Sequence, residues 1–432
     1  MARRRVRCGR WVALLGVAAL AGAVVAPAAA AGGGSGDFPA VDQPGVSDSQ
    51  IKVSGVATVT NDPTGNTLGS AFDGVKAYFD YINTTEDGVY GRELVLDGEH
   101  DDQLANNRQE IERILSDDQP FAVLPIATDL FTGASLLDEA GIPSFGWNIN
   151  EEWGSENNKP GPANLFGQFG SFHCFTCAAA NPISWLPKKL GLKKVGIVAY
   201  EVEQSATCAE GAEASFEKFK TGDVVFTDTS LPFGAVDYSG DVARMVEEGV
   251  DYVVPCLDGN GAVVLLREMQ KQGLDATVLL ANAYNQKYAE ENAQFLDGNY
   301  VFTVFAPFET RPKPEGLKLY QQWMKKSGGD QNENSYVGWM NADLFVEGLK
   351  AAGPDFTQQK VVDAINGMTD YTAKGILPGV DWTKAHETDA ECYAVMQFQD
   401  GKYEPVFGKK GKPFLCWPPD LKTMPKNPQV AP

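Results

Sequence analysis

The sequence predicts an α/β protein with two Rossmann-like lobes, each built on a parallel sheet. Short apolar runs alternate with segments of helical spacing, and this alternation comes in two sets that meet near residue 172. Strands that alternate with helices form parallel sheets covered on both faces. The length, 432 residues, leaves room for two such lobes.

The first set of elements occupies residues 51–146. The helix expected at 68–82 has apolar residues at helical spacing, and the run at 51–57 is short and apolar, as a buried parallel strand is. A loop is expected at 58–66. The remaining expectations are strands at 93–96, 121–125 and 142–146 and helices at 106–115 and 130–139.

The second set follows residue 172, and the pattern changes again near residue 315. The second set has expected helices at 182–190, 206–219, 242–248 and 262–272 and expected strands at 195–200, 224–227, 252–256 and 277–281. The C-terminal part predicts helices at 315–326, 336–352 and 358–368. A hairpin at 392–399 and 403–407 should turn at Asp400-Gly401.

The N-terminus predicts export. Residues 1–31 combine five arginines without an acid, an apolar run and a small-residue site, which is the pattern of a secretory signal peptide. The alternative, a membrane anchor, is disfavoured because the run is shorter than the ~20 residues that span a bilayer. The Gly-rich segment 32–45 is expected to be a flexible linker, and no cysteine stands where a lipid anchor would be attached. We therefore expect a released, extracytoplasmic protein.

Composition and charge exclude some partners. The hydrophobic fraction of 43% is that of a globular protein with a full core. The formal net charge is −21, and the signal would remove only arginines. Nucleic acid and anionic membranes require clustered basic residues, so neither is an expected partner.

Six cysteines remain after the signal: Cys174, Cys177, Cys208, Cys256, Cys392 and Cys416. An even number in an exported chain predicts three disulfides. A metal or redox site at Cys174-x-x-Cys177 beside His173 is the alternative, but a structural zinc site requires four ligands with recognisable spacing. We expect no metal and no cofactor.

Strand topology suggests how the cysteines pair. If the second lobe has the flavodoxin-like order 2-1-3-4-5, its first and third strands are neighbours. Cys208 follows the first and Cys256 ends the third, both on the carboxyl side. Cys392–Cys416 would then hold the last hairpin to the tail, leaving Cys174–Cys177 as a local link.

Enzyme signatures are weak. The segment Gly167-Gln-Phe-Gly-Ser171 does not supply the Gly-x-Ser-x-Gly elbow of a serine hydrolase, and the chain has only three histidines. No phosphate-binding Gly-rich loop is visible, and the many carboxylates are not concentrated as a glycosidase pair. We expect a protein that is not an enzyme, with a secreted hydrolase as the weaker alternative.

An ordered series of segments resembles one family. The series is GVSDSQIKV at 45–53, GSAFDGVKAYFDYIN at 69–83, GVYGREL at 88–94, the acidic pair 101–102, AGIP at 140–143 and YVGWMNADLFVEGL at 336–349. In this order they resemble the leucine/isoleucine/valine-binding type of extracytoplasmic solute-binding protein from ABC importers. The likeness covers nearly the whole mature chain.

The resemblance implies a type I periplasmic binding fold that closes around a ligand. Lobe one would comprise 46–170 and 306–372, lobe two 171–305 and 373–418, and 419–432 a tail, with three chain segments crossing at the hinge. A small polar solute, such as an amino acid or a related amide or acid, would bind between the lobes and pass to a membrane permease. The chain is expected to be a monomer. A sensor that signals to a membrane receptor is the alternative use of the same fold.

Loops at the carboxyl ends of the strands supply the candidate ligand residues. In lobe one these are Thr60, Asn61, Ala127, Thr128, Trp147, Asn148 and Asn150. Thr128 matches the family's Ser/Thr that holds a ligand carboxylate, or it caps the helix expected at 130. Trp147 departs from the family's small residues and either stacks on a cyclic ligand or seals the lobe.

In lobe two the candidates are Tyr200 and Gln204 after the first strand, Asp258 after the third and Tyr284 after the fourth. The resemblance implies that Asp258 meets a ligand ammonium group. The alternative is that Asp258 caps the following helix.

Overall fold

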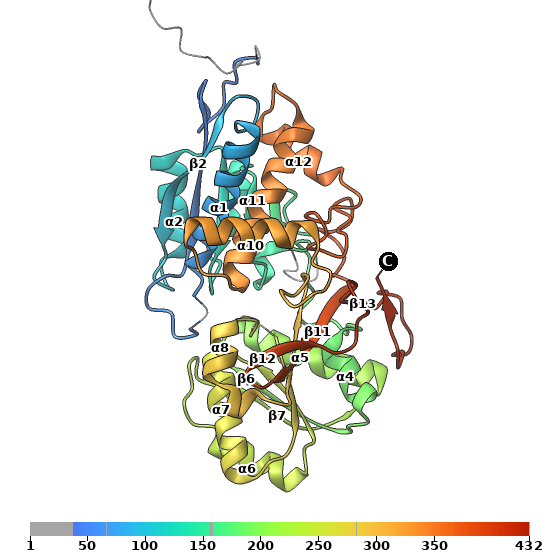
Figure 1. The fold of residues 1–432 in the computed structure, drawn as a ribbon. Helices are drawn as coiled ribbons and strands as arrows, with labels where there is room; N and C mark the ends of the chain where they lie inside the picture. The colour runs from blue at the N-terminus through green and yellow to red at the C-terminus, as the bar shows by residue number, and fades with distance from the viewer. Residues whose placement is uncertain (1–37, 66, 155–158, 282, 432) are drawn as a thin grey trace, which may run out of the picture. The chain divides into compact units, whose positions relative to one another are not determined.

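The computed structural model describes residues 38–65, 67–154, 159–281 and 283–431 (Figure 1). By its internal contacts, the part of the chain from residue 38 onward forms the second of two units, the first being residues 1–37, which lie outside the described residues. The expected signal peptide, 1–31, and the first part of the expected linker lie outside the described residues. Every element below belongs to the second unit.

The first sheet has five strands in the order β2-β1-β3-β4-β5, and each neighbouring pair is parallel. Its central strand β3 is buried throughout and reads AVLPIA, a continuous apolar run typical of a strand covered on both faces. The bounds are β1 (Gln50–Ala57), β2 (Glu93–Asp101), β3 (Ala122–Ala127), β4 (Ser144–Gly146) and β5 (Leu165–Gly167).

Helices from two distant parts of the chain accompany this sheet. The N-terminal ones are α1 (Ser70–Glu86), α2 (Asn107–Arg113) with the π-turn η1 (Ile114–Asp118), α3 (Ala134–Ala140) and the short η2 (Glu151–Trp153). The C-terminal ones are α10 (Glu315–Ser327), α11 (Glu333–Ala352) and α12 (Gln358–Asn366). Helix α11 is buried along most of its length, because it packs against α1, α12 and the sheet.

Two glycines allow α1 and α11 to pack closely. A Cβ on Gly74 would lie 1.9 Å from the carbonyl oxygen of Ser335, and one on Gly338 would lie 2.0 Å from that of Ala71. Both obstacles are backbone atoms, so neither contact is relieved by a side-chain rotation. The close approach therefore depends on glycine at both positions.

We expect Gly74→Ala to destabilise the protein by about 3 kcal/mol, because the two helices must separate to admit the methyl group. Gly240→Ala is the matched control: Gly240 lies in a helix and a Cβ there would meet nothing within 4 Å. Urea unfolding followed by circular dichroism measures both. Equal midpoints for the two variants would contradict the close-packing argument.

The second sheet runs β14-β13-β11-β10-β9-β8-β6-β7, with β12 paired to β11. Strands β6 to β10 are parallel and β11 joins β10 antiparallel. In Figure 1 the red C-terminal strands accordingly lie with the green and yellow elements. The bounds are β6 (Lys194–Tyr200), β7 (Asp223–Leu231), β8 (Tyr252–Cys256), β9 (Thr277–Leu280), β10 (Tyr300–Thr303), β11 (Cys392–Gln399), β12 (Lys402–Pro405), β13 (Phe414–Cys416) and β14 (Gln429–Val430).

The helices of the second lobe alternate with these strands. They are α4 (Pro182–Leu190), α5 (Glu203–Phe219), α6 (Ser239–Glu248), α7 (Gly259–Gln272), α8 (Gln286–Glu291) and α9 (Ala293–Leu296). The parallel part of each sheet has the order 2-1-3-4-5, which confirms the fold class and the flavodoxin-like order expected for the second lobe.

The chain passes between the two sheets three times, through residues 168–181, 304–314 and 367–391. Hydrogen bonds tie these segments together. The backbone N–H groups of Ser171 and Phe172 both donate to the carbonyl of Ala385 at 2.9 Å, and that of Ala306 donates to the carbonyl of Ile376 at 2.7 Å. The crossing segments therefore form one connected group.

The three disulfides are those expected from the topology. Cys208–Cys256 joins α5 to the end of β8, Cys392–Cys416 joins β11 to β13, and Cys174–Cys177 closes a short loop in the first crossing segment. The metal alternative at Cys174 and Cys177 is wrong, because their sulfurs are bonded to each other.

Several boundaries differ from the sequence expectations. Residues 38–45 are not a flexible linker: the Pro39 carbonyl accepts a hydrogen bond from Arg92, and the Gln43 side chain accepts one from the backbone of Gln358. The expected tail contains β14, which pairs with β13. The helix expected at 130 begins at Ala134, after the N-cap Gly133, whose backbone N–H donates to the Asn107 side chain.

Candidate functional site

A cavity of about 240 Å³ lies where the carboxyl ends of the strands of both sheets meet. From the first sheet it is lined by the loops after β3 and β4, including Trp147 and Asn148. From the second it is lined by Tyr200, the last residue of β6, and by residues after β8, including Asp258. A smaller cavity of about 40 Å³ shares Thr64, Trp147 and Glu333 with it.

The structure brings together six of the residues predicted from the sequence. The larger cavity is lined by Trp147, Asn148, Tyr200, Gln204 and Asp258, and the smaller one by Trp147 and Tyr284. Each lies at the carboxyl end of a parallel strand or shortly after it, which is where α/β sheets bind their ligands.

The other predicted residues line neither cavity. Thr60 is exposed and donates to the Asp101 carboxylate at 2.6 Å, while Asn61 is exposed with a positive φ. Ala127 is the last residue of β3 and is buried in the core. Asn150 is also buried, and its amide donates to the Asp129 carbonyl at 3.0 Å.

Thr128 is also buried, and its hydroxyl oxygen has no hydrogen-bond partner in the structure. The suggestion that it caps a helix is wrong, because α3 begins at Ala134 after Gly133. Its role toward a ligand carboxylate stays a prediction.

Asp258 combines both roles that the sequence left open. It is the N-cap of α7, and its carboxylate accepts from the backbone N–H of Gly261 at 3.0 Å and from the Tyr200 hydroxyl at 2.7 Å. A Cβ on Gly261 would lie 2.0 Å from the Tyr200 hydroxyl, so glycine there admits the tyrosine. Burial raises the pKa of Asp258. An opposite charge in the cavity would offset the desolvation cost of ionising this carboxylate.

Trp147 and Asn148 form the wall contributed by the first lobe. Trp147 is 3% exposed and belongs to the core cluster, yet it lines both cavities. The Asn148 amide group donates to the Gly170 carbonyl at 2.8 Å, which fixes the orientation of the side chain. Its Oδ1 is buried and has no partner. This oxygen is an acceptor that a ligand donor would satisfy.

Two hydrogen bonds cross the cleft from the second lobe to the first. The Gln204 amide donates to the Asp129 carbonyl at 3.2 Å, and the Asn260 amide donates to the Pro63 carbonyl at 2.9 Å. Both donors lie at the N-terminal end of a helix, in α5 and α7. These contacts join the two lobes directly at the mouth of the site.

Glu333 is a cavity residue that the sequence reasoning missed. It is the first residue of α11, after the N-cap Asn332, whose side chain accepts from the backbone N–H of Ser335. The helix was expected to begin at 336. The capping box formed by Asn332 and Ser335 indicates a helix that begins at residue 333, so it was the signal that could have placed Glu333 at the helix start.

Burial raises the pKa of Glu333 to about 7 from an ordinary 4.5. The folded protein then holds a proton that the unfolded chain has lost, so the free energy of unfolding should fall as pH rises from about 4.5 to 7. We expect the Tm of the wild type to fall more than that of Glu333→Gln over this range, measured by calorimetry without solute.

The groups around Glu333 support that comparison. Tyr284 and Tyr288 share the smaller cavity with Glu333, and Tyr403 interacts with it. Burial raises the pKa of all three tyrosines, so they stay neutral between pH 4.5 and 7. Asp258 titrates in the same direction but is unchanged by the substitution. Identical pH dependence in the two proteins would therefore contradict the assignment to Glu333.

The described part of the chain holds no group of three or more His, Cys, Asp or Glu side chains arranged to bind a metal ion. His173 instead bonds through Nδ1 to the Asp389 carboxylate at 3.0 Å. Within the same described residues, no helix is both long and apolar enough to cross a membrane.

Comparison with known proteins places the chain among binding proteins. A family model described as "Periplasmic binding protein" matches residues 50–402. No curated protein matches the chain. Several solved structures share its fold at low sequence identity, and all of those below are covered almost completely by this chain.

A branched-chain amino acid ABC transporter from Thermus thermophilus with bound valine has a TM-score of 0.70 at 18% identity, covering 84% of this chain and 96% of its own. A fatty acid ABC transporter substrate-binding protein from Thermomonospora curvata has a TM-score of 0.70 at 17% identity, covering 91% and 97%. A solute-binding protein from R. palustris in complex with benzoate has a TM-score of 0.67 at 14% identity, covering 86% and 98%.

Proposed function

This chain belongs to the periplasmic binding protein family, and we propose that it is the extracytoplasmic solute-binding subunit of an ABC importer. It closes two lobes around a small polar solute, an amino acid or a related amide or acid, and delivers that solute to a membrane permease. The cavity between the carboxyl ends of two parallel sheets supports this proposal.

Closure requires contacts that form only when the lobes meet. The Gln204–Asp129 and Asn260–Pro63 hydrogen bonds are such contacts, because each joins residues of opposite lobes. A solute that touches both walls adds to them and shifts the protein toward the closed form. The solute is thereby enclosed without being transformed.

The related structures bind chemically different solutes, namely valine, a fatty acid and benzoate, according to their descriptions. Fold likeness therefore does not choose among them. Asp258 favours a solute with a positive group, because its carboxylate lies in the cavity wall where desolvation makes an unpaired charge costly.

The experiment is to purify the protein natively, identify co-purifying small molecules by mass spectrometry, and test each by calorimetry and thermal unfolding. A solute at 100 times its Kd should stabilise the folded state by about 2.7 kcal/mol and be recovered unchanged. Recovery of a converted product would contradict a binding role and indicate an enzyme.

A further inference from the structure

The larger cavity continues from the cleft into the second lobe. Beyond the polar residues near Asp258 its lining becomes apolar, between the first crossing segment on one side and α5 and the sheet on the other. The lining residues of this arm include Phe175, Ile183, Ala212 and Phe302, together with the Cys174–Cys177 and Cys208–Cys256 disulfides. The wall of the arm is thus mostly carbon and sulfur, with Asn181, Ser215 and Thr303 as its polar members.

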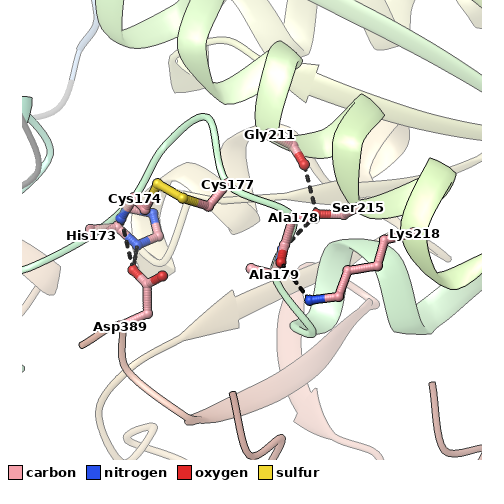
Figure 2. The surroundings of a disulfide bond; sticks show 9 residues. All are labelled: His173, Cys174, Cys177, Ala178, Ala179, Gly211, Ser215, Lys218 and Asp389. Carbon is pink, nitrogen blue, oxygen red and sulfur yellow. Dashed lines mark hydrogen bonds and ion pairs between the residues drawn. A yellow bond between two sulfur atoms is a disulfide. The ribbon is translucent and has the colours of Figure 1, made fainter. Parts of the chain in front are cut away.

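The segment that covers this arm is fixed at both ends, as Figure 2 shows. At one end, Asp389 accepts from the backbone N–H of Cys174 at 2.9 Å and contacts His173 at 3.0 Å. At the other end, the backbone N–H of Ala179 donates to the Ser215 hydroxyl at 3.0 Å. Hydrogen bonds therefore fix both ends of the segment that covers the arm.

The covering segment also touches α5 closely. A Cβ on Gly211 would lie 1.9 Å from the carbonyl oxygen of Phe175, so glycine at this helix position lets the segment approach. Lys218, one turn beyond Ser215, donates to the Ala178 carbonyl at 3.4 Å. The backbone polar groups of the cover are thus partly satisfied by α5, which leaves its apolar side chains for the arm.

The hydroxyl groups that line the cavity already donate within the protein. Each has an acceptor at hydrogen-bonding distance: Thr64 to Asp62 at 2.5 Å, Tyr200 to Asp258 at 2.7 Å, Ser205 to the Cys256 carbonyl at 2.5 Å, Ser215 to the Gly211 carbonyl at 2.6 Å, Thr303 to the Phe305 carbonyl at 2.8 Å and Tyr393 to the Ala390 carbonyl at 3.0 Å. A hydroxyl has one proton to donate, so these groups offer a ligand only lone pairs.

Acceptors, by contrast, remain at the cleft end. Asn148 Oδ1 has no partner, and Asp258 and Glu333 contribute two carboxyl groups. Among the described residues, no lysine or arginine lines either cavity, and the undescribed internal positions 66, 155–158 and 282 are not basic in the sequence. An anionic ligand would find no lysine or arginine here and one imidazole, His173, whose Nδ1 already bonds to Asp389, whereas an amine would find acceptors.

We propose that the solute is an organic amine with an uncharged apolar body: its N–H donors meet Asn148, Asp258 and Glu333, and its body fills the arm beside Phe175 and Ala212. This inference rests on the binding function proposed above and departs from the solute class given there, because the amine carries no carboxylate. The volume is adequate, because an apolar cavity of ~150 Å³ binds benzene and this one is about 240 Å³.

The test compares probes of matched shape and opposite charge by calorimetry on the full mature protein at pH 7.5. 2-Phenylethylamine should bind at least tenfold tighter than 3-phenylpropanoate, because only the amine supplies donors for the acceptors of Asn148, Asp258 and Glu333. Ethylamine should bind at least tenfold more weakly than 2-phenylethylamine, because it leaves the arm empty. Equal or tighter binding of the carboxylate would overturn the proposal.

A cavity-filling variant tests the arm separately. Ala212→Leu should weaken binding of 2-phenylethylamine at least tenfold and leave ethylamine unchanged, while Ala214→Leu, on the same helix but outside the cavity lining, is the control. If Ala212→Leu does not fold, Ala179→Leu, from the covering segment, blocks the same arm. Unchanged affinity in a folded arm variant would overturn the proposal.

The two proposals fail in different ways. A co-purifying solute that is anionic or wholly polar, bound and recovered unchanged, would overturn the amine inference and leave the transport role intact. Conversion of an apolar amine to a product would support the ligand class and overturn the transport role.

Discussion

Replacing both Cys208 and Cys256 by serine is expected to lower the free energy of unfolding by about 4 kcal/mol. Their disulfide closes a loop with a sequence separation of 48 and links α5 to the end of β8 in the middle of the second sheet. Removing it frees the unfolded chain, and the entropy regained grows with the length of the loop. Urea unfolding under non-reducing conditions measures the loss.

The Cys174→Ser/Cys177→Ser variant is the matched comparison. This disulfide has a sequence separation of 3, for which the same relation gives about 2 kcal/mol. The long-loop variant should therefore unfold at clearly lower urea concentration than the short-loop variant. The reverse order would show that native packing around Cys174 and Cys177, rather than loop closure, dominates their contributions.

Asp258→Asn is expected to weaken binding of a cationic solute by about 10- to 100-fold, because a charge-assisted hydrogen bond contributes about 1.5–3 kcal/mol. Asparagine is as good an N-cap as aspartate, so the start of α7 should be retained. The NH2 group of the new asparagine can also donate to the Tyr200 hydroxyl, whose oxygen is able to accept a hydrogen bond. Calorimetry with 2-phenylethylamine measures the affinity.

Asp258→Ala separates the two roles of this residue. It removes the charge and the cap together, so it should lose the same affinity and about 1 kcal/mol of stability. A normal Tm for Asp258→Asn combined with weak binding would assign the carboxylate to the ligand. Full affinity in Asp258→Asn would leave Asp258 with its capping role alone.

Strand order accounts for most of what the sequence could predict. Because neighbouring parallel strands end at one edge of their sheet, Tyr200 at the end of β6 and Asp258 after β8 had to lie together, and they do. Trp147, after β4 of the other sheet, meets them because the two sheets face each other across the cavity, which only the resemblance to a two-lobed binding protein implied. The same order placed Cys208 beside Cys256. These inferences need only the sequence of elements along the chain, which hydrophobic periodicity gives reliably.

Local loop geometry accounts for the failures. Thr60 follows β1 at the correct edge, but Asp101 at the end of β2 draws its hydroxyl away from the cavity. Ala127 is still inside β3, where its side chain is buried in the core, and the first residue after β3 that lines the cavity is Asp129. Glu333 comes from a helix far along the chain, and its place in the cavity depends on how α11 packs against α1. Such packing is set by tertiary contacts.

The cavity and the hinge share residues. Phe169, His173 and Phe175 of the first crossing segment line it, as does Val304 of the second. If the lobes close as proposed, a solute in the arm would press on the segments about which they turn, and a shift of a fraction of an ångström there would become a much larger displacement at the outer ends of the lobes. Under the proposed transport role, selectivity would then operate through leverage, because a body of the wrong width would leave the lobe tips too far apart for a permease to engage.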